Sequence, residues 1–213
     1  PRLLSPLAYQ RDRGLQIEAV AATPALLARL HDPAYEVVWS RWNAFEVSGP
    51  LVAPLLRATT VASVLGLAAL AALFVAWFRR GARPEAAAHL ALTAVALFMI
   101  TSRALSPQYL LWLAALAVVV PGLARPADAA SQSDATLTLA WTAVLLALTT
   151  LVYPLFYDDL LSGARALPTW LLAARNAALV AFAARCAWLA VRPGPGSLPD
   201  APRLGRDRAD EED

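Results

Sequence analysis

The chain has 213 residues, of which 59% are hydrophobic and only 16% are charged. Soluble domains usually carry about 25% charged residues, so this composition is typical of an integral membrane protein. The net charge of +2 is small and the basic residues, all arginine, are dispersed, which argues against nucleic-acid binding. The single cysteine, Cys186, excludes a disulfide within the chain.

The first residue is Pro1, and no signal-peptide pattern follows it. We therefore expect this chain to be the C-terminal part of a longer protein, with catalytic residues upstream.

Residues 1–50 are expected to form a separate segment outside the membrane. The stretch GLQIEAVAATPALLARL (residues 14–30) places apolar residues along one helical stripe, so it predicts a helix, kinked at Pro24. The runs YEVVW and FEVSG, which follow it, alternate apolar and polar residues and predict a small β-hairpin. Aromatic side chains on this hairpin are expected at the lipid headgroup level; they are Trp39, Trp42 and Phe45.

Five apolar segments follow within residues 51–191, the expected transmembrane domain. A helix needs roughly 17–25 apolar residues to cross the hydrocarbon layer. The second and third segments are short by that measure, which suggests tilted helices or helices that end early around a cavity. We predict an all-α polytopic membrane protein with about five transmembrane helices. The segments are approximately 55–78, 86–101, 109–123, 135–156 and 168–191.

Arginines in the short loops predict the orientation. The loops after the first, third and fifth segments hold most of them, so these loops are expected in the cytoplasm. Residues 1–50 then lie outside, and the tail 192–213, rich in Pro, Gly and charge, is expected to be cytoplasmic and disordered. The expected location is the plasma membrane, crossed several times. The cytoplasmic arginines are Arg79, Arg80, Arg83, Arg125 and Arg192, against Arg103 and Arg165 outside.

A candidate anion site lies at the start of the third segment. Ser106 and Pro107 are typical of a helix N-cap and first helical position. The free N–H groups of a helix start attract anions such as phosphate. Arg103 would add a positive charge, and Gln108 and Tyr109 would add donors. The alternative is an ordinary capped helix with an arginine that reaches up to the headgroups.

A second candidate lies between Tyr9 and Val20. On a helix, Arg13 and Gln16 share a side, whereas Glu18 lies about 140° from Arg13. One of Arg13 and Glu18 would then bind a ligand while the other fixes the segment to its neighbours. The alternative is an amphipathic helix with a solvated polar side.

Four other polar positions carry weaker expectations. Arg175, beside Asn176 within the fifth segment, is either functional or reaches the headgroups. Arg185 is expected to extend to the inner headgroups, and Asp158 with Asp159 to be solvated in an outer turn.

The string RGLQIEA, residues 13–19, and the string SPQYLLWL, residues 106–113, taken together resemble glycosyltransferase family 87, of the GT-C superfamily of membrane enzymes. This family includes polyprenyl-phosphate-mannose-dependent α-1,2-mannosyltransferases. Three positions depart from the family pattern: Gln10 replaces a histidine, Ala19 a serine and Arg103 a lysine. The matching residues are Arg13, Gly14, Leu15, Gln16 and Glu18 in RGLQIEA, and Ser106, Pro107, Gln108, Tyr109 and Trp112 in SPQYLLWL.

This resemblance covers roughly residues 9–125 and implies a GT-C-like C-terminal half. It implies an inverting hexosyltransferase that moves a sugar, mannose by the resemblance, from a polyprenyl-phosphate donor to a hydroxyl of a glycolipid or glycan acceptor. The reaction would take place at the outer face and serve envelope glycolipid or polysaccharide synthesis. The family's catalytic aspartate lies on the first outer loop, upstream of this chain, so the catalytic base stays unknown. We expect neither metal nor cofactor.

The sequence leaves two other classes of function open. A transporter or flippase-like protein also has short helices and arginine within the membrane. A non-catalytic membrane scaffold would keep the fold without the reaction. For the enzyme, the expected substrate-binding residues are Arg13, Gln16, Glu18, Arg103, Ser106, Gln108 and Tyr109.

Overall fold

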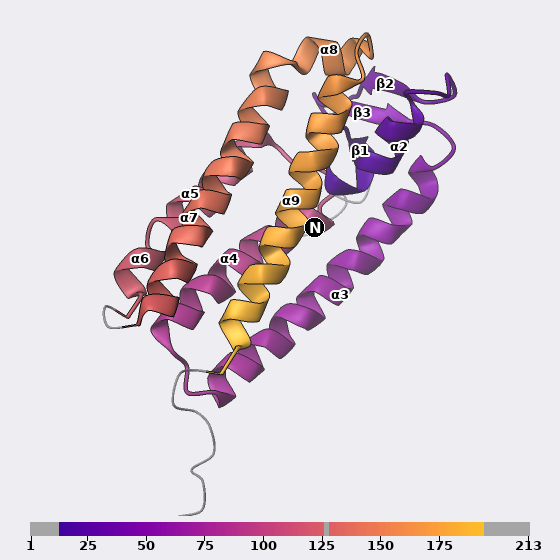
Figure 1. The fold of residues 1–213 in the computed structure, drawn as a ribbon. Coiled ribbons are helices and arrows are strands. Elements are labelled where there is room, and N and C mark those ends of the chain that lie inside the picture. Colours follow the sequence, from indigo (N-terminus) through magenta and orange to yellow (C-terminus); the bar gives the residue numbers. More distant parts are fainter. Residues whose placement is uncertain (1–12, 126–127, 194–213) are drawn as a thin grey trace, which may run out of the picture.

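A computed structural model of the protein describes residues 13–125 and 128–193. Residues 13–50 form a small α/β unit, which we call the cap, and the remaining described residues form long helices that extend away from it (Figure 1). The tail predicted to be disordered lies outside the described residues from position 194 onward.

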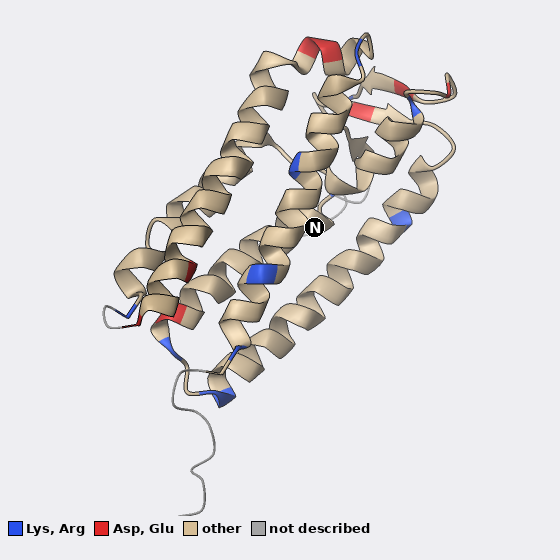
Figure 2. Cartoon of the chain, viewed as in Figure 1, with Lys and Arg blue, Asp and Glu red and all other residues tan. Residues whose placement is uncertain are grey.

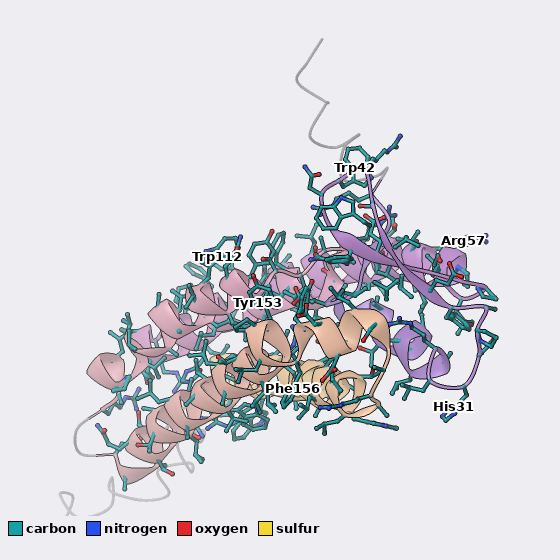
Figure 3. All side chains as sticks on the ribbon, turned by 90° about the horizontal axis from the view of Figure 1, so that it is seen from above. His31, Trp42, Arg57, Trp112, Tyr153 and Phe156 are labelled. Carbon is teal, nitrogen blue, oxygen red and sulfur yellow. The ribbon has the colours of Figure 1, made fainter. Side chains whose placement is uncertain are left out.

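The cap is built on a three-stranded antiparallel sheet in the order β1-β3-β2. Strands β2 (Glu36–Trp39) and β3 (Phe45–Ser48) pair with Val37 opposite Val47, so the predicted hairpin is confirmed. Asn43 in its turn has a φ of 53°, a left-handed conformation that asparagine tolerates better than most residues. Seen from above, Trp42 at the hairpin tip projects sideways past the helices (Figure 3).

The helix predicted over residues 14–30 is wrong in its first half. Strand β1 (Leu15–Gln16) pairs with β3, a 3₁₀ turn η2 (Val20–Ala22) follows, and only then does helix α2 (Thr23–Ala28) begin. Pairing with β3 gives backbone groups of this strand their hydrogen-bond partners, so a helix is not needed to supply them. Pro24 lies in the first turn of α2, where it is well tolerated, and does not kink a longer helix.

Four of the described helices are long and apolar enough to cross a membrane. At 1.5 Å per residue the longest of them is about 42 Å long, which exceeds the roughly 30 Å of bilayer hydrocarbon. These helices are α3 (Val52–Arg79), α4 (Pro84–Thr101), α7 (Ala129–Thr150) continued by the π-helical η4 (Leu151–Leu155), and α9 (Leu167–Val191).

The third predicted segment is different, because it forms a shorter and interrupted helix over Pro107–Leu123. It consists of the 3₁₀ turn η3 (Pro107–Tyr109), α5 (Leu110–Ala117) and α6 (Val120–Leu123). The expectation of five crossings therefore becomes four long helices and one short one. Whether the short one crosses the bilayer stays a prediction.

Helices α4 and α9 lie side by side at the centre of the bundle (Figure 1). Their contact is apolar: Leu92 and Met99 of α4 and Leu179 and Phe182 of α9 are fully buried in one cluster. In contrast, α3 lies at the edge, and its most apolar stretch is not buried within the protein.

The cap is fixed to the ends of α8 (Tyr157–Ser162) and α9 by an apolar cluster and by hydrogen bonds. Leu15, Ile17 and Leu26 of the cap are buried with Leu160 and Leu172. The guanidinium of Arg29 donates to the Leu160 and Leu161 carbonyls at 2.9 and 2.7 Å. These contacts hold the sheet over one end of the bundle.

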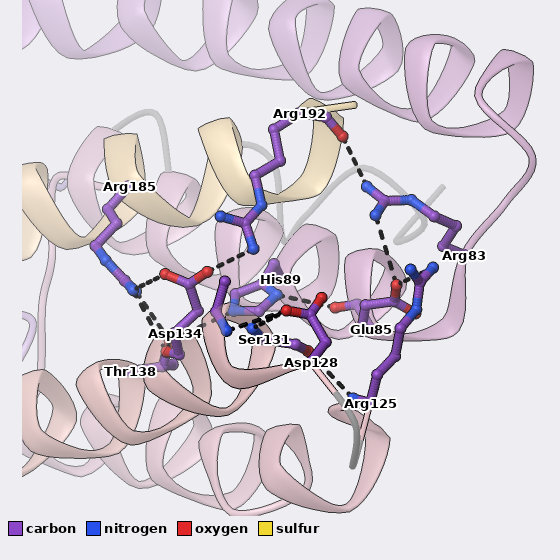
Figure 4. A network of polar contacts seen from close by, with 11 residues as sticks. Arg83, Glu85, His89, Arg125, Asp128, Ser131, Asp134, Thr138, Arg185 and Arg192 are labelled. Carbon is purple, nitrogen blue, oxygen red and sulfur yellow. Dashed lines mark hydrogen bonds and ion pairs between the residues drawn. The ribbon is translucent and has the colours of Figure 1, made fainter. Parts of the chain in front are cut away.

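The arginine-bearing loops predicted to share one side do meet at one end of the bundle. Basic side chains gather at the end of the bundle opposite the cap (Figure 2), and Arg83, Arg125 and Arg192 belong to one network of polar contacts (Figure 4). The Arg83 guanidinium donates to the Arg192 carbonyl at 2.7 Å. This bond joins the start of α4 to the end of α9. Their cytoplasmic location stays a prediction.

Candidate functional site

A cavity of about 580 Å³ lies between α3 and α4, beneath the cap. The residues that line it are polar or small near the cap and apolar farther along the helices. The polar or small lining residues are Arg13, Thr59, Thr60, Ser63, Gly66, Thr101, Ser102, Arg103, Ala104 and Tyr109, and the apolar ones are Val64, Leu67, Leu70, Ala94, Leu97 and Phe98.

Two arginines reach the polar end from different parts of the chain. Arg103 follows α4, and its guanidinium donates to Thr60 Oγ1 at 2.7 Å and to the Leu56 carbonyl at 3.4 Å. The backbone N–H of Gln16 donates to the Arg103 carbonyl at 3.0 Å. Because this bond ties β1 to the loop after α4, it brings Arg13, just before β1, to the same cavity as Arg103.

One face of α3 supplies the polar wall. Thr59, Ser63 and Gly66 follow a spacing of four and then three residues, which places them on one side of a helix. Ser63 Oγ donates to the Thr101 carbonyl at 3.2 Å. A Cβ atom on Gly66 would lie 3.4 Å from Thr101 Cγ2, so the absence of a side chain keeps this part of the cavity open. Sequence reasoning missed this stripe, although its spacing was visible.

The apolar part of the cavity extends along the helices, away from the cap. From Thr60 to Leu70 the rise along α3 is about 15 Å, roughly half the hydrocarbon thickness. Leu67 and Leu70 face Leu97 and Phe98 across it. The arrangement suits a molecule with an anionic head and a hydrocarbon tail.

The structure brings together only some of the predicted site residues. Arg13, Arg103 and Tyr109 line the cavity, and Gln16 adjoins it through its backbone. Glu18, Ser106 and Gln108 are outside the cavity lining.

The predicted helix start at Ser106 is present, but its geometry differs from a capped α-helix. Ser106 is extended and Pro107 begins a 3₁₀ turn of three residues before α5. Across the described chain, no capping bond is made by the Ser106 hydroxyl, and Gln108 is exposed. The first residues of the helix start predicted to bind an anion lie outside the cavity lining, whereas Arg13 and Arg103 line it.

Glu18 lies outside the cavity and contacts α9. The Arg175 guanidinium donates to the Glu18 backbone carbonyl at 3.0 Å, and both residues are 2% exposed. Burial raises the pKa of the Glu18 carboxyl to about 7, although the charge of Arg175 acts in the opposite direction. Asn176 donates to Thr23 Oγ1 at 2.7 Å. Arg175 and Asn176 thus fix the cap to α9, and Arg175 is buried and does not extend to the headgroups.

The end opposite the cap holds a network of paired charges (Figure 4). Arg185 forms an ion pair with Asp134 at 2.8 Å and donates to Thr138 Oγ1 at 3.0 Å, so the expectation that it extends to the headgroups is wrong. Arg125 pairs with Glu85 at 2.8 Å. A gap with a volume of only about 20 Å³ lies at this end, lined by charged residues that include Glu85, Asp134 and Arg192.

Asp158 and Asp159 lie in the first turn of α8, and Asp159 pairs with the exposed Arg165 at 3.4 Å. Within residues 13–125 and 128–193, no three His, Cys, Asp or Glu side chains are grouped so as to hold a metal ion.

Comparison with known proteins adds no relative: no family model, no curated protein and no solved structure matches the chain.

Proposed function

We propose that this protein is a membrane glycosyltransferase that takes its sugar from a polyprenyl-phosphate donor. The observation that carries the proposal is the cavity between α3 and α4, with two arginines at one end and leucines and a phenylalanine at the other. A lipid phosphate has the same division between an anionic head and an apolar tail. The resemblance of RGLQIEA and SPQYLLWL to glycosyltransferase family 87 supports the same substrate, since both strings contribute residues to this cavity.

The proposed reaction is transfer with inversion at the sugar carbon. The acceptor hydroxyl oxygen forms a bond to the anomeric carbon while the bond from that carbon to the phosphate oxygen breaks. The electron pair leaves with the polyprenyl phosphate, and the acceptor proton passes to a base. Arg13 and Arg103 would stabilise the charge on the departing phosphate. We assign no catalytic base within this chain.

The proposed topology places the cap at the outer face and the Arg83, Arg125 and Arg192 loops in the cytoplasm. The cavity then opens at the depth where a lipid-linked sugar presents its phosphate. Acceptors are proposed to be glycolipids or glycans of the envelope, and the sugar mannose.

The test is the Arg103→Ala variant of the complete encoded protein, assayed for transfer of mannose from polyprenyl-phosphate mannose. We expect the rate to fall at least 100-fold, because removal of one charge-stabilising donor from an active site has that order of effect. Arg57→Ala is the matched control. Arg57 is an exposed arginine of α3, a helix that lines the cavity, but Arg57 itself lies outside the cavity lining (Figure 3).

Equal rates for Arg103→Ala and Arg57→Ala would remove Arg103 from the site. A wild-type protein that binds the lipid and moves it between bilayer leaflets without sugar transfer would instead support a flippase. Binding with neither activity would support a scaffold.

A further inference from the structure

Glu46 is a buried carboxylate at the cap, and no function proposed above uses it. It lies in the central strand β3, is 9% exposed, and finds no donor for Oε1 among the described residues. A buried carboxylate oxygen without a donor is costly, because it has lost its water without a replacement. Such an atom in a native site points to a partner that is absent when the site is empty.

The surroundings of Glu46 define what that partner must contact. Gln16 is directly opposite Glu46 in the β1–β3 pair, so both side chains project from the same face of the sheet. Gly14 precedes Gln16 by two residues and belongs to this face as well. A Cβ atom on Gly14 would lie 2.7 Å from Cδ of Glu46, so the carboxylate occupies space that only glycine leaves open.

The same residues connect this pair to the cavity. Arg13, which lines the cavity, is covalently bonded to Gly14, and the Gln16 N–H holds the Arg103 carbonyl at 3.0 Å. The Glu46 carboxylate therefore packs against the residue next to Arg13, and Gln16 is bonded through its backbone to Arg103. A group attached directly to a phosphate held by these arginines would reach them first.

We propose that Glu46 and Gln16 form a subsite for the hydroxyl groups of the sugar attached to the lipid phosphate. A carboxylate accepts hydrogen bonds, whereas an amide both donates and accepts them, which matches hydroxyl groups that do both. This inference rests on the proposed function, because it assigns the sugar end of the same donor. Gly14 has the accompanying role of leaving room for the carboxylate.

The experiment compares two lipids, polyprenyl-phosphate mannose and polyprenyl phosphate without sugar, binding to the complete protein in nanodiscs. We expect the wild type to prefer the mannose-bearing lipid. Glu46→Gln should weaken binding of that lipid about 10-fold, because a hydrogen bond to a charged acceptor is lost, and should leave binding of the bare phosphate unchanged. Gly14→Ala should give the same selective loss by displacing the carboxylate.

Glu36→Gln is the matched control, since Glu36 is an exposed glutamate of the neighbouring strand β2. Equal affinity of the wild type for the two lipids would overturn the subsite, as would a loss in Glu46→Gln that is the same for both lipids. Failure of the proposed function has a separate signature, because the wild type would then bind neither lipid or would bind them without transferring mannose.

Discussion

The two ends of the helix bundle differ in how much open space lies beside their arginines. At the end opposite the cap, Arg125 and Arg185 pair with Glu85 and Asp134, and the remaining gap measures about 20 Å³. At the cap end, Arg103 donates to the neutral oxygens of Thr60 and Leu56, and about 580 Å³ stays open beside it.

We interpret this difference as one between an end that holds the helices together and an end that is proposed to bind a ligand. Carboxylates neutralise arginines where the helices are held together, so those charges have little attraction left for a ligand. At the cap end, Arg103 lies beside the open cavity, where an anion is proposed to bind. The predictions below test whether the two ends behave in these separate ways.

The largest effect on stability is expected at the paired end. Asp134→Ala removes the partner of both Arg185 and Arg192, whose side chains are mostly buried. Breaking a buried pair by removing one partner costs about 3–5 kcal/mol, so the thermal unfolding temperature in detergent should fall by more than in any cap-end surface variant. Binding of polyprenyl phosphate, measured below that temperature, should be unchanged.

The control for this variant is Asp159→Ala, which removes an ion pair of the same type from the cap end. Its partner Arg165 is 69% exposed, so the expected loss is at most about 1 kcal/mol. Similar losses in the two variants would contradict the view that the far end holds the bundle together.

A smaller, pH-dependent effect is expected at the cap end. The Glu18 carboxyl has its pKa raised from 4.5 to about 7 in the folded protein, mainly by burial. Between these two values the folded state binds more protons than the unfolded state, so stability falls as the pH rises from about 4.5 to 7 and then levels off. The expected change is about 3 kcal/mol.

Glu18→Gln should flatten this pH dependence, because the amide does not titrate. The measurement is resistance of the cap to proteolysis between pH 4.5 and 8, with Glu36→Gln as an exposed control on the same unit. An unaltered pH profile in Glu18→Gln would show that another group is responsible; the charged or titratable side chains that act on Glu18 in this region are Arg175 and Tyr157.

The sequence predicted the features that depend on local pattern. The hairpin was predicted from two alternating runs, and the long helices from apolar length, because both signals are contained in a few neighbouring residues. The gathering of the arginine-bearing loops at one end also followed from the alternation of the segments.

Features set by contacts distant in sequence were missed. Leu15 and Gln16 have a helical pattern but form a strand, because β3, about 30 residues later, supplies their hydrogen bonds. Arg185 was expected to extend to the headgroups, but Asp134 lies beside it only after α7 and α9 have packed. The cavity likewise depends on how α3 lies against α4, although the stripe of Thr59, Ser63 and Gly66 was a usable signal.

The most direct test of the account is to locate a bound lipid phosphate. A polyprenyl phosphate with a photoreactive group in its first isoprene units would be crosslinked to the complete protein, and the adducts identified by mass spectrometry. We predict adducts at Leu67 and Leu70 of α3 and at Leu97 and Phe98 of α4, reduced strongly in Arg103→Ala. Adducts found mainly on outward-facing residues such as Trp170 and Trp188 of α9, with no effect of Arg103→Ala, would contradict it.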